Sequence, residues 1–463
     1  MSDGAAPPTI FNAIPPDVVG ICQRLRDKGK RGWVVGGCVR DLLRGRQAKD
    51  WDVATDAHPE DVLRFFRKVI PTGIQHGTVT VLIKGKPYEV TTLRGEGSYH
   101  DGRRPSEVVF LEDIVEDLAR RDFTFNAIAI DPLEGTLIDP FGGQRDLAAH
   151  VVRAVGEPIE RFAEDGLRVL RAARFAALLD CEVEPRTLAA MGDARALATY
   201  AKVSVERIHD EWMKTMGARR PSVAFELIRR SGTLAITCPE LLEGVGCEQN
   251  QWHGYDVWGH TMAVLDACPP DAVLRLAALL HDVGKPRTRE LSEKTQDYTF
   301  YQHEVVGADM ADAILRRLKT STEHRKRVVH VVRHHLVCYS PEWSDAAVRR
   351  FIRRSLPERI DDLLELACAD ALGKGRPVDE ELAALGELRR RVDAVLAAGA
   401  ALKPGDLALD GRELMVELGL VPGPLVGVIQ RALVELVTDD PEANTRERLL
   451  EAARELAAKE LSP

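Results

Sequence analysis

The sequence predicts an α+β unit with a mixed sheet at its amino-terminal end, followed by a longer, predominantly α-helical region. Two observations lead to this fold class. The first ~150 residues contain short apolar runs, rich in β-branched residues and separated by glycine and proline, which is typical of strands. From about Phe162 onward, apolar residues recur at helical spacing and strand signals almost vanish. The 463 residues suggest about three domains, at roughly 100–200 residues per domain.

The elements follow from these patterns in chain order. In the first part we expect strands at Trp33–Val35, Thr78–Ile83, Tyr88–Leu93 and Phe123–Ile130, with helices at Pro59–Val69 and Leu111–Ala119. The later helical patterns cover Glu164–Leu179, Val203–Met216, Val223–Ser231, Leu274–Leu280 and Ala308–Leu318. We therefore expect a flexible start (1–16), a head (17–150), a helical neck and body (151–230), an all-α histidine-rich domain (231–378) and a helical tail (379–463).

Composition excludes some classes of protein and leaves others open. No run approaches the ~18 apolar residues of a membrane span, so we expect no membrane association. The eight cysteines form no C-x-x-C pair, which favours free thiols in the cytoplasm. The net charge of −9 is unusual for a protein that binds RNA, although clustered basic residues can offset it. Such clusters, which fit RNA contacts or solvated helix faces equally well, occur at 316–319, 325–327 and 349–354.

A glycine pair precedes two closely spaced acids. Gly36 and Gly37 stand between a predicted strand and a helix start, where backbone N–H groups can approach phosphate. Asp50 and Asp52 follow, and in a strand both carboxylates would point to one face. Glu89 is a third acid, in another predicted strand. Three such carboxylates suit Mg²⁺, which prefers oxygen ligands.

The string Gly36-Gly37-x-Val39-Arg40-Asp41, followed by Asp50-x-Asp52-Val53-Ala54-Thr55, resembles the nucleotidyltransferase signature of the DNA polymerase β superfamily. It is similar to the class II branch, the CCA-adding tRNA nucleotidyltransferases and bacterial poly(A) polymerases. The resemblance implies a polymerase β-like head in which Asp50 and Asp52 bind the catalytic Mg²⁺, with Glu89 as a third ligand. Gly37 and Arg40 are candidate nucleotide-binding residues.

A second motif runs from Arg120 to Ala127. It resembles the family segment that contacts the ribose and triphosphate. Arg121 is a candidate triphosphate clamp, because its guanidinium matches phosphate oxygens. Asp122 and Asn126 are candidates to hold ribose hydroxyls or to orient Arg121.

Asp165 and Arg168 lie three residues apart in a predicted helix and would share a face. A carboxylate there can accept from the amino group of cytosine or adenine while the arginine donates to the ring nitrogen. Spacing alone equally fits a surface salt bridge. The resemblance to the family's Glu-Asp-x-x-Arg motif implies that the pair reads the base. Arg171 and Arg174 continue this face, either toward phosphates or packed against the head.

Three further strings favour CCA addition within the family. They are Thr72-Gly73-x-x-His76-Gly77, the segment Tyr99-x-Asp101-x-Arg103-Arg104-Pro105, which resembles the loop used to switch from C to A, and the tail pattern at 410–415, 422–424 and 444. The expected substrates are therefore CTP, ATP and tRNA. A poly(A) polymerase and an enzyme that adds only CC remain alternatives.

The histidine-rich domain carries a second candidate metal site. His260, His281-Asp282 and Asp370 follow the order of HD phosphohydrolases, and His303, His334 and His335 are candidates for a second metal. Imidazoles mixed with carboxylates suit a divalent transition metal better than Mg²⁺ alone. Lys285 is placed to neutralise a phosphate. The resemblance implies phosphatase and 2′,3′-cyclic phosphodiesterase activity on damaged RNA ends. An HD phosphohydrolase whose head only binds RNA is the alternative from another class.

Overall fold

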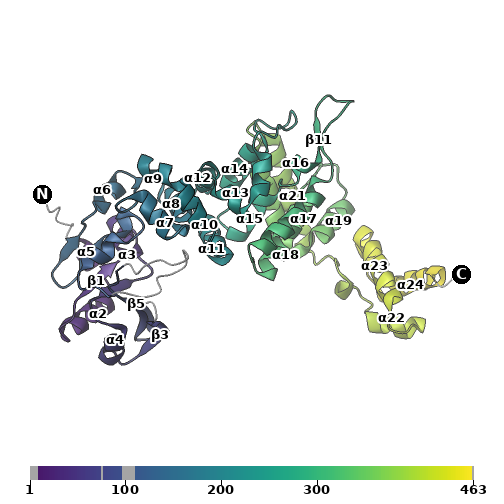
Figure 1. Ribbon diagram of the computed structural model, residues 1–463. Helices are drawn as coiled ribbons and strands as arrows, with labels where there is room; N and C mark the ends of the chain where they lie inside the picture. Colours follow the sequence, from purple (N-terminus) through teal and green to yellow (C-terminus); the bar gives the residue numbers. More distant parts are fainter. Residues whose placement is uncertain (1–8, 75–76, 96–109, 461–463) are drawn as a thin grey trace. The chain divides into compact units, whose positions relative to one another are not determined.

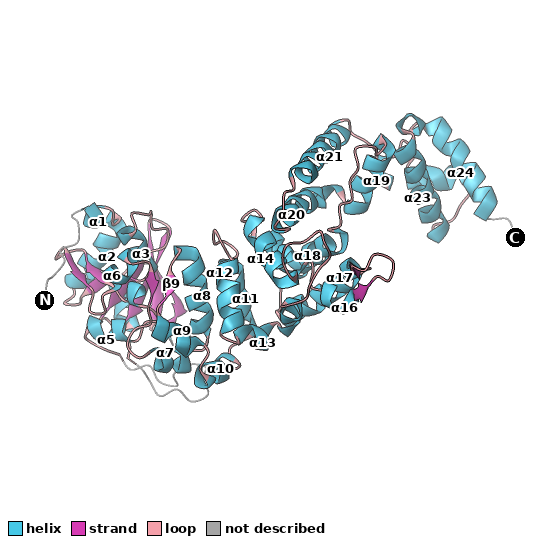
Figure 2. Ribbon diagram, turned by 90° about the horizontal axis from the view of Figure 1, so that it is seen from above, coloured by secondary structure: helices cyan, strands magenta, loops and turns pink. Residues whose placement is uncertain are grey.

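The structure is a computed structural model that describes residues 9–74, 77–95 and 110–460. It divides into two compact units, Met1–Leu242 and Glu243–Pro463. The first unit holds the large sheet, and the second is helical apart from one hairpin (Figure 2). This confirms the predicted fold class.

The first unit is built on a seven-stranded mixed sheet in the order β3-β4-β5-β2-β1-β6-β7 (Figure 1). Only β2 and β5 run parallel among these neighbours. The parallel register aligns Asp52 with Glu89. The strands are β1 (Gly32–Val35), β2 (Asp52–Thr55), β3 (Val69–Gly73), β4 (Thr78–Ile83), β5 (Lys86–Thr92), β6 (Ala129–Asp131) and β7 (Thr136–Ile138).

The two faces of this sheet are covered by apolar side chains. β1 is buried along its whole length, with Val34 on one face and Trp33 and Val35 on the other. The helices of this part are α1 (Thr9–Asn12), α2 (Pro16–Arg26), α3 (Gly37–Leu43), α4 (Pro59–Phe65), α5 (Ile114–Ala119) and α6 (Gly143–Ala148).

The rest of the first unit is helical. Its helices are α7 (Pro158–Glu164), α8 (Leu167–Leu179), α9 (Pro185–Met191), α10 (Ala194–Tyr200), α11 (Val205–Thr215), α12 (Ser222–Arg230) and α13 (Thr233–Thr237). Two short strands, β8 (Val151–Val152) and β9 (Glu182–Val183), pair in parallel. Helix α8 packs against α11 and α12. Its polar face lies beside the second motif, the segment from Arg120 to Ala127.

Three sequence predictions need correction here. Asp50 lies in a bend before β2, so it is not paired in the sheet. The predicted strand Phe123–Ile130 is a 3₁₀ turn, Thr124–Asn126, followed by β6, because Asn126 is held by side-chain hydrogen bonds to Arg40 and Asp122. The predicted helix Glu164–Leu179 is broken between α7 and α8.

The second unit contains the helices α14 (Val257–Ala267), α15 (Ala272–Leu280), α16 (Lys285–Thr288), α17 (His303–Arg317), α18 (Thr322–His334), α19 (Asp345–Ser355), α20 (Ile360–Gly373) and α21 (Asp379–Ala397). A hairpin of β10 (Arg289–Leu291) and β11 (Tyr298–Phe300) stands between α16 and α17. Helix α21 shares an apolar core with α19 and α20.

The last helices, α22 (Gly411–Leu418), α23 (Pro424–Asp439) and α24 (Arg446–Glu460), have their own core. Asp410 and Glu413 form a capping box at the start of α22. The basic cluster on α19 contacts α23: Arg349 donates to the Thr438 carbonyl oxygen at 2.6 Å, and Arg350 pairs with Asp439. In this structure these arginines therefore hold the tail.

Candidate active sites

A cavity of about 1030 Å³ opens in the first unit where β1, β2 and β5 meet α8 and α11. Eleven arginine and lysine side chains and six carboxylates line it, so a strongly cationic cavity lies within an acidic protein. All eleven residues of this unit that were predicted to bind Mg²⁺ or nucleotide contribute to the lining: Gly37, Arg40, Asp50, Asp52, Glu89, Arg121, Asp122, Asn126, Asp165, Arg168 and Arg171.

Asp52 begins β2 and lies directly beside Glu89 on β5. Its Oδ2 would be only 3.2 Å from a Cβ on Gly36, whose φ of +82° also favours glycine. Burial and the charge of Glu89 raise the pKa of Asp52, with a smaller contribution from Asp50. Crowded carboxylates that repel one another fit a divalent cation, whose charge would offset the repulsion. Asp50, Asp52 and Glu89 are therefore suitable Mg²⁺ ligands.

The second motif is held in place by a buried acid. Asp117, 2% exposed, accepts hydrogen bonds from Arg120 at 2.5 Å and from Arg121 at 3.3 Å. Arg121 also donates to the Asn126 carbonyl oxygen at 3.3 Å. Its guanidinium is thus fixed toward the cavity, within 3.5 Å of a Cβ placed on Gly36. A fixed arginine beside the carboxylates is well placed to bind triphosphate oxygens.

Asn126 connects this motif to its neighbours. Its Oδ1 accepts from Arg40 at 3.1 Å, and its Nδ2 donates to Asp122 Oδ1 at 3.0 Å. The other Asp122 oxygen accepts from Arg171 Nε at 2.7 Å. Burial alone would raise the pKa of Asp122, but Arg171 and the amide of Asn126 outweigh it and lower that pKa. In this structure Arg171 therefore helps to hold the second motif in place through its hydrogen bond to Asp122.

Asp165 lies in the break between α7 and α8, not inside a helix as predicted. Its Oδ1 accepts from the backbone N–H of Leu167 at 3.1 Å, and its Oδ2 accepts from Arg207 at 2.7 Å. Arg168 instead donates to Glu164 at 2.6 Å and to the Arg120 carbonyl oxygen at 2.9 Å. The two predicted base-reading residues thus share the cavity but are held by separate partners.

Among the cationic residues of this cavity, the role of Arg174 was left open on sequence alone, and Arg46, Lys49, Arg94, Arg207 and Lys214 were not considered. Arg207 and Lys214 lie seven residues apart on amphipathic α11, a spacing that places both on one helix face. Glu211 lies between them, buried, and accepts from Arg174 at 2.6 Å. The heptad spacing was the signal that could have identified this face.

Two predicted strings cannot be placed. His76 and the segment from Tyr99 to Pro105 lie outside the described residues.

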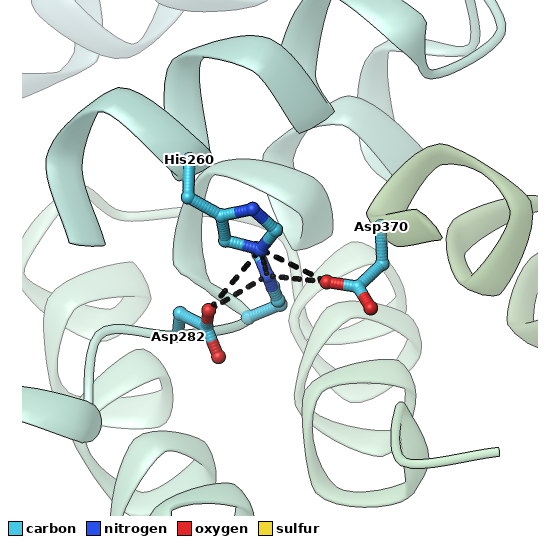
Figure 3. Close-up of side chains that lie close together, drawn as sticks. His260, Asp282 and Asp370 are labelled. Carbon is cyan, nitrogen blue, oxygen red and sulfur yellow. Dashed lines mark hydrogen bonds and ion pairs between the residues drawn. The ribbon is translucent and has the colours of Figure 1, made fainter. Parts of the chain in front are cut away.

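In the second unit, His260 on α14, Asp282, and Asp370 on α20 converge (Figure 3). His281, which directly follows α15, belongs to the same group. His260 Nε2 lies 2.9 Å from Asp370 Oδ1 and 3.4 Å from Asp282 Oδ2. His281 Nε2 lies 3.1 Å from the same Asp282 oxygen. Burial opposes charge on His281, yet Asp282 and Asp370 outweigh it and raise the pKa of His281 to about 10. The group therefore stabilises positive charge at its centre.

Asp282 also belongs to a second group, with His303 and His335. Its Oδ1 lies 3.5 Å from His303 Nε2 and 3.7 Å from His335 Nε2. Neither Asp282 oxygen accepts a well-formed hydrogen bond from any described residue, although both are buried. One carboxylate thus faces two histidine pairs, as a carboxylate that bridges two metal ions would.

The four imidazoles are oriented alike. In each, Nδ1 lies within 3.0 Å of a backbone carbonyl oxygen, that of Gly373, Ala278, Phe300 or Val332. A carbonyl accepts only from N–H, so Nε2 is left to bind a metal. The Nε2 atoms face each other at 3.3 Å in the pairs His260–His281 and His303–His335. This donor set fits divalent transition metals.

The prediction that His334 binds metal is corrected. Its ring packs against His330 with centroids 4.5 Å apart, and it does not join either group. Helix α18 ends at His334, and adjacent residues there point in different directions. His335, the next residue, lies in the second group with Asp282 and His303 instead. Lys285 Nζ lies 2.7 Å from Asp282 Oδ2, and its role in neutralising a phosphate stays a prediction.

Three family models match the chain. They are the Poly A polymerase head domain over residues 32–153, the "Probable RNA and SrmB- binding site of polymerase A" over 180–244, and the HD domain over 259–372. A protein of Lactobacillus johnsonii called CCA-adding enzyme is 45% identical, with 49% of this chain and just over half of that protein (55%) covered. A CCA-adding enzyme of Limosilactobacillus fermentum is 33% identical, with 94% of this chain and 96% of that protein covered.

The chain belongs to the CCA-adding enzyme family.

A solved structure agrees with this assignment. The CCA-adding enzyme of Bacillus stearothermophilus, solved in complex with CTP, is 30% identical, with a TM-score of 0.72 over 96% of this chain and 99% of that one. The chain is thus a nucleotidyltransferase of this family, as the head motifs indicated. The described residues contain no helix long and apolar enough to cross a bilayer, and none of the eight cysteines, all of which are described, forms a disulfide.

Proposed function

We propose that this protein adds CCA to the 3′ end of tRNA, using CTP and ATP and no nucleic-acid template. The observation that supports this most directly is that one cavity of the first unit holds the carboxylates, the arginines and Asp165 together. Relatives named for CCA addition match over nearly the whole chain. This substrate would place the enzyme in the cytoplasm.

The proposed reaction is attack of the RNA 3′-hydroxyl on the α-phosphate of the incoming nucleotide, with loss of pyrophosphate. Asp50, Asp52 and Glu89 would hold Mg²⁺, which when bound promotes deprotonation of the hydroxyl and stabilises the charge that develops on the phosphate. Arg121, fixed by Asp117, donates to triphosphate oxygens.

In the proposed reaction, Asp165 and Arg168 select the base of the incoming nucleotide. The Asp165 carboxylate accepts from the amino group that cytosine and adenine share, and Arg168 donates to a ring nitrogen. Uracil and guanine present a carbonyl oxygen at that point, which the carboxylate repels. Both side chains must first leave their present partners, Arg207 and Glu164, or turn their remaining hydrogen-bonding atoms to the base.

The first test is incorporation of labelled CMP into tRNA that lacks CCA. Asp52→Ala should reduce the rate by several orders of magnitude, because one of the carboxylates that hold the cation is lost. Asp56→Ala is the matched control, since Asp56 lies just after β2 outside the cavity lining. Wild-type rates in Asp52→Ala would refute the assignment.

A second function is favoured by the metal groups of the second unit. We propose that this HD domain hydrolyses phosphoesters, as a phosphatase or 2′,3′-cyclic phosphodiesterase acting on RNA ends. His260, His281, His303, His335, Asp282 and Asp370 would hold a transition metal pair, which when bound supplies the Lewis acidity for attack of water on phosphorus. Lys285 is placed to offset phosphate charge beside Asp282.

The hydrolase is tested with metal-free protein reloaded with Mn²⁺, Ni²⁺, Co²⁺ or Fe²⁺. Phosphatase activity should return with at least one metal and be absent in Asp282→Asn, which changes the residue shared by both groups. The control is Asp309→Asn, which changes an exposed acid on α17 that pairs with Arg333. Activity equal to wild type in Asp282→Asn would refute hydrolysis at this site.

A further inference from the structure

A solvent-exposed tryptophan lies beside the metal groups of the second unit. Trp252 is 53% exposed, although it belongs to the short segment that leads into α14, the helix of His260. The guanidinium of Arg376 lies over its ring, 4.9 Å from the centroid. Arg376 Nε is buried and has no hydrogen-bond partner among the described residues. A large exposed aromatic ring backed by a cation is a surface on which a nucleobase stacks well.

Residues close to Trp252 and Arg376 in the chain contact residues of the metal groups. His253 follows Trp252, and its ring meets the ring of His260 edge to face with centroids 4.9 Å apart. Lys374 precedes Arg376 by two residues, and its Nζ lies 4.0 Å from Asp370 Oδ2. The two segments are fastened to each other, since Gly254 N–H donates to the Lys374 carbonyl oxygen at 2.8 Å.

These contacts limit the distance between Trp252 and the metal groups. Consecutive Cα atoms are about 3.8 Å apart, so Trp252 lies within side-chain reach of the residues that contact the ligand set. The close packing of Gly375 against Tyr255 keeps the two segments together, because a Cβ on Gly375 would meet the Tyr255 ring at 2.4 Å. A phosphate at the metal groups would therefore have a stacking surface for an attached base nearby.

Charge on this side of the site also suits a phosphate ester. Lys285 lies 2.7 Å from Asp282, and Lys374 lies 4.0 Å from Asp370 while it pairs more closely with Glu381 at 2.5 Å, so Lys285 is the cation nearest to the ligand carboxylates. A simple alkyl phosphate would use only these cations and the metals. An aromatic platform adds binding only for a substrate that carries a ring.

We propose that Trp252 and Arg376 form a base-stacking platform for the HD site, so that its substrates are phosphoesters of a nucleoside, free or at an RNA 3′ end, rather than small alkyl phosphates. The proposal rests on the hydrolytic function proposed above. Trp252 is a specificity-determining residue in this account and takes no part in the bond cleavage itself.

The test compares adenosine 3′-monophosphate with glycerol 2-phosphate, two secondary phosphate monoesters of which only the first carries a base. In metal-loaded protein, Trp252→Ala should raise KM for the nucleotide about tenfold, in line with the usual contribution of one base stacked on an aromatic ring. kcat should change little. KM for glycerol 2-phosphate should not change, and Trp252→Phe should restore most of the nucleotide KM. Leu291→Ala, which removes another exposed apolar side chain, is the control.

Equilibrium binding supplies a second measurement that does not depend on turnover. Titration calorimetry with adenosine 3′-monophosphate should show about tenfold weaker binding at the second unit in Trp252→Ala, while any binding to the cavity of the first unit stays the same in both proteins. Equal binding in wild type and Trp252→Ala, or no preference of the wild type for the nucleotide, would overturn the platform. Binding that depends on Trp252 without hydrolysis of either ester would support the platform and overturn the hydrolase.

Discussion

At the scale of single residues, the head site holds carboxylates that repel one another. Asp52 is largely buried beside Glu89, and burial and that charge raise its pKa. An acid whose pKa is higher in the folded than in the unfolded state costs the fold stability at any pH above the folded pKa. This cost is lost as the pH falls through that value, because the carboxyl group becomes neutral.

Asp52→Asn should therefore raise the melting temperature in EDTA by a few degrees at pH 8, since the amide carries no charge. The gain should be smaller at pH 4 than at pH 8, because the raised pKa of Asp52 lets the wild-type carboxyl take up a proton earlier as the pH falls. Added Mg²⁺ should stabilise the wild type and not the variant. Thermal unfolding at both pH values, with and without Mg²⁺, measures this; a variant less stable than wild type in EDTA at pH 8 would contradict it.

Asp165 is the residue on which base choice depends. Asp165→Ala should increase UMP and GMP incorporation relative to CMP by roughly tenfold, because the carboxylate that repels their carbonyl oxygens is gone. Glu160→Ala is the control, as it removes a carboxylate from the exposed pair with Arg195. Competition assays with mixed nucleotides measure the ratio. The same discrimination in Asp165→Ala and wild type would remove Asp165 from this role.

At the scale of elements, the break between α7 and α8 sets the position of Asp165. Gly166 occupies that break, and a Cβ there would lie 2.3 Å from the backbone nitrogen of Tyr200 on α10. Its φ of −58° is ordinary, so glycine is required by close approach and not by backbone conformation.

Gly166→Ala should lower stability by at least ~1–3 kcal/mol, the usual cost of an overpacked site, and should impair nucleotide selection as well. Gly20→Ala is the matched control: Gly20 lies inside α2 with nothing within 4 Å of the new Cβ, and alanine there should stabilise by about 0.5–1 kcal/mol. Denaturant melts measure both. Equal stability of Gly166→Ala and wild type would show that the break is more adaptable than its packing indicates.

The sequence predicted the elements that depend on local pattern. β4 has the predicted bounds, and β1 differs by one residue, because alternating or continuous β-branched runs are a local signal. The run Phe123–Ile130 has the same composition but folds as a turn and a short strand. Its course depends on Asn126 bonding to Arg40, 86 residues away, which no local pattern encodes.

The candidate sites likewise contain some features that the sequence predicts and others that depend on tertiary structure. Residue types, their order and the family resemblance singled out Asp52, Asp165, His260 and Asp370 as candidates, and the structure places the first two in the cavity of the first unit and the last two in a histidine–carboxylate group of the second. The choice between His334 and His335 depends on where α18 ends, and the partnership of Asp165 with Arg207 depends on how α8 and α11 pack. Such facts require tertiary structure.

At the scale of the whole molecule, the two proposed activities belong to separate units. Every residue that lines the nucleotide cavity lies in the first unit, and every residue of the metal groups lies in the second. The acidic net charge is also unevenly spread, since the nucleotide cavity is cationic.

Asp282→Asn should therefore abolish transition-metal binding and hydrolysis while CMP incorporation stays within about twofold of wild type. Asp52→Ala should have the opposite effects. Metal content by mass spectrometry and the two activity assays on both variants measure this. Loss of CMP incorporation in a folded Asp282→Asn protein would show that the two units are coupled.

The central claim is template-free synthesis of one short, defined sequence. It is tested most directly by incubating the wild type with tRNA that lacks CCA and sizing the products with CTP alone, with ATP alone and with both. We predict extension by C residues with CTP alone, little extension with ATP alone, and a stop after CCA with both. Long A tails, or a stop after CC when both nucleotides are present, would contradict the account.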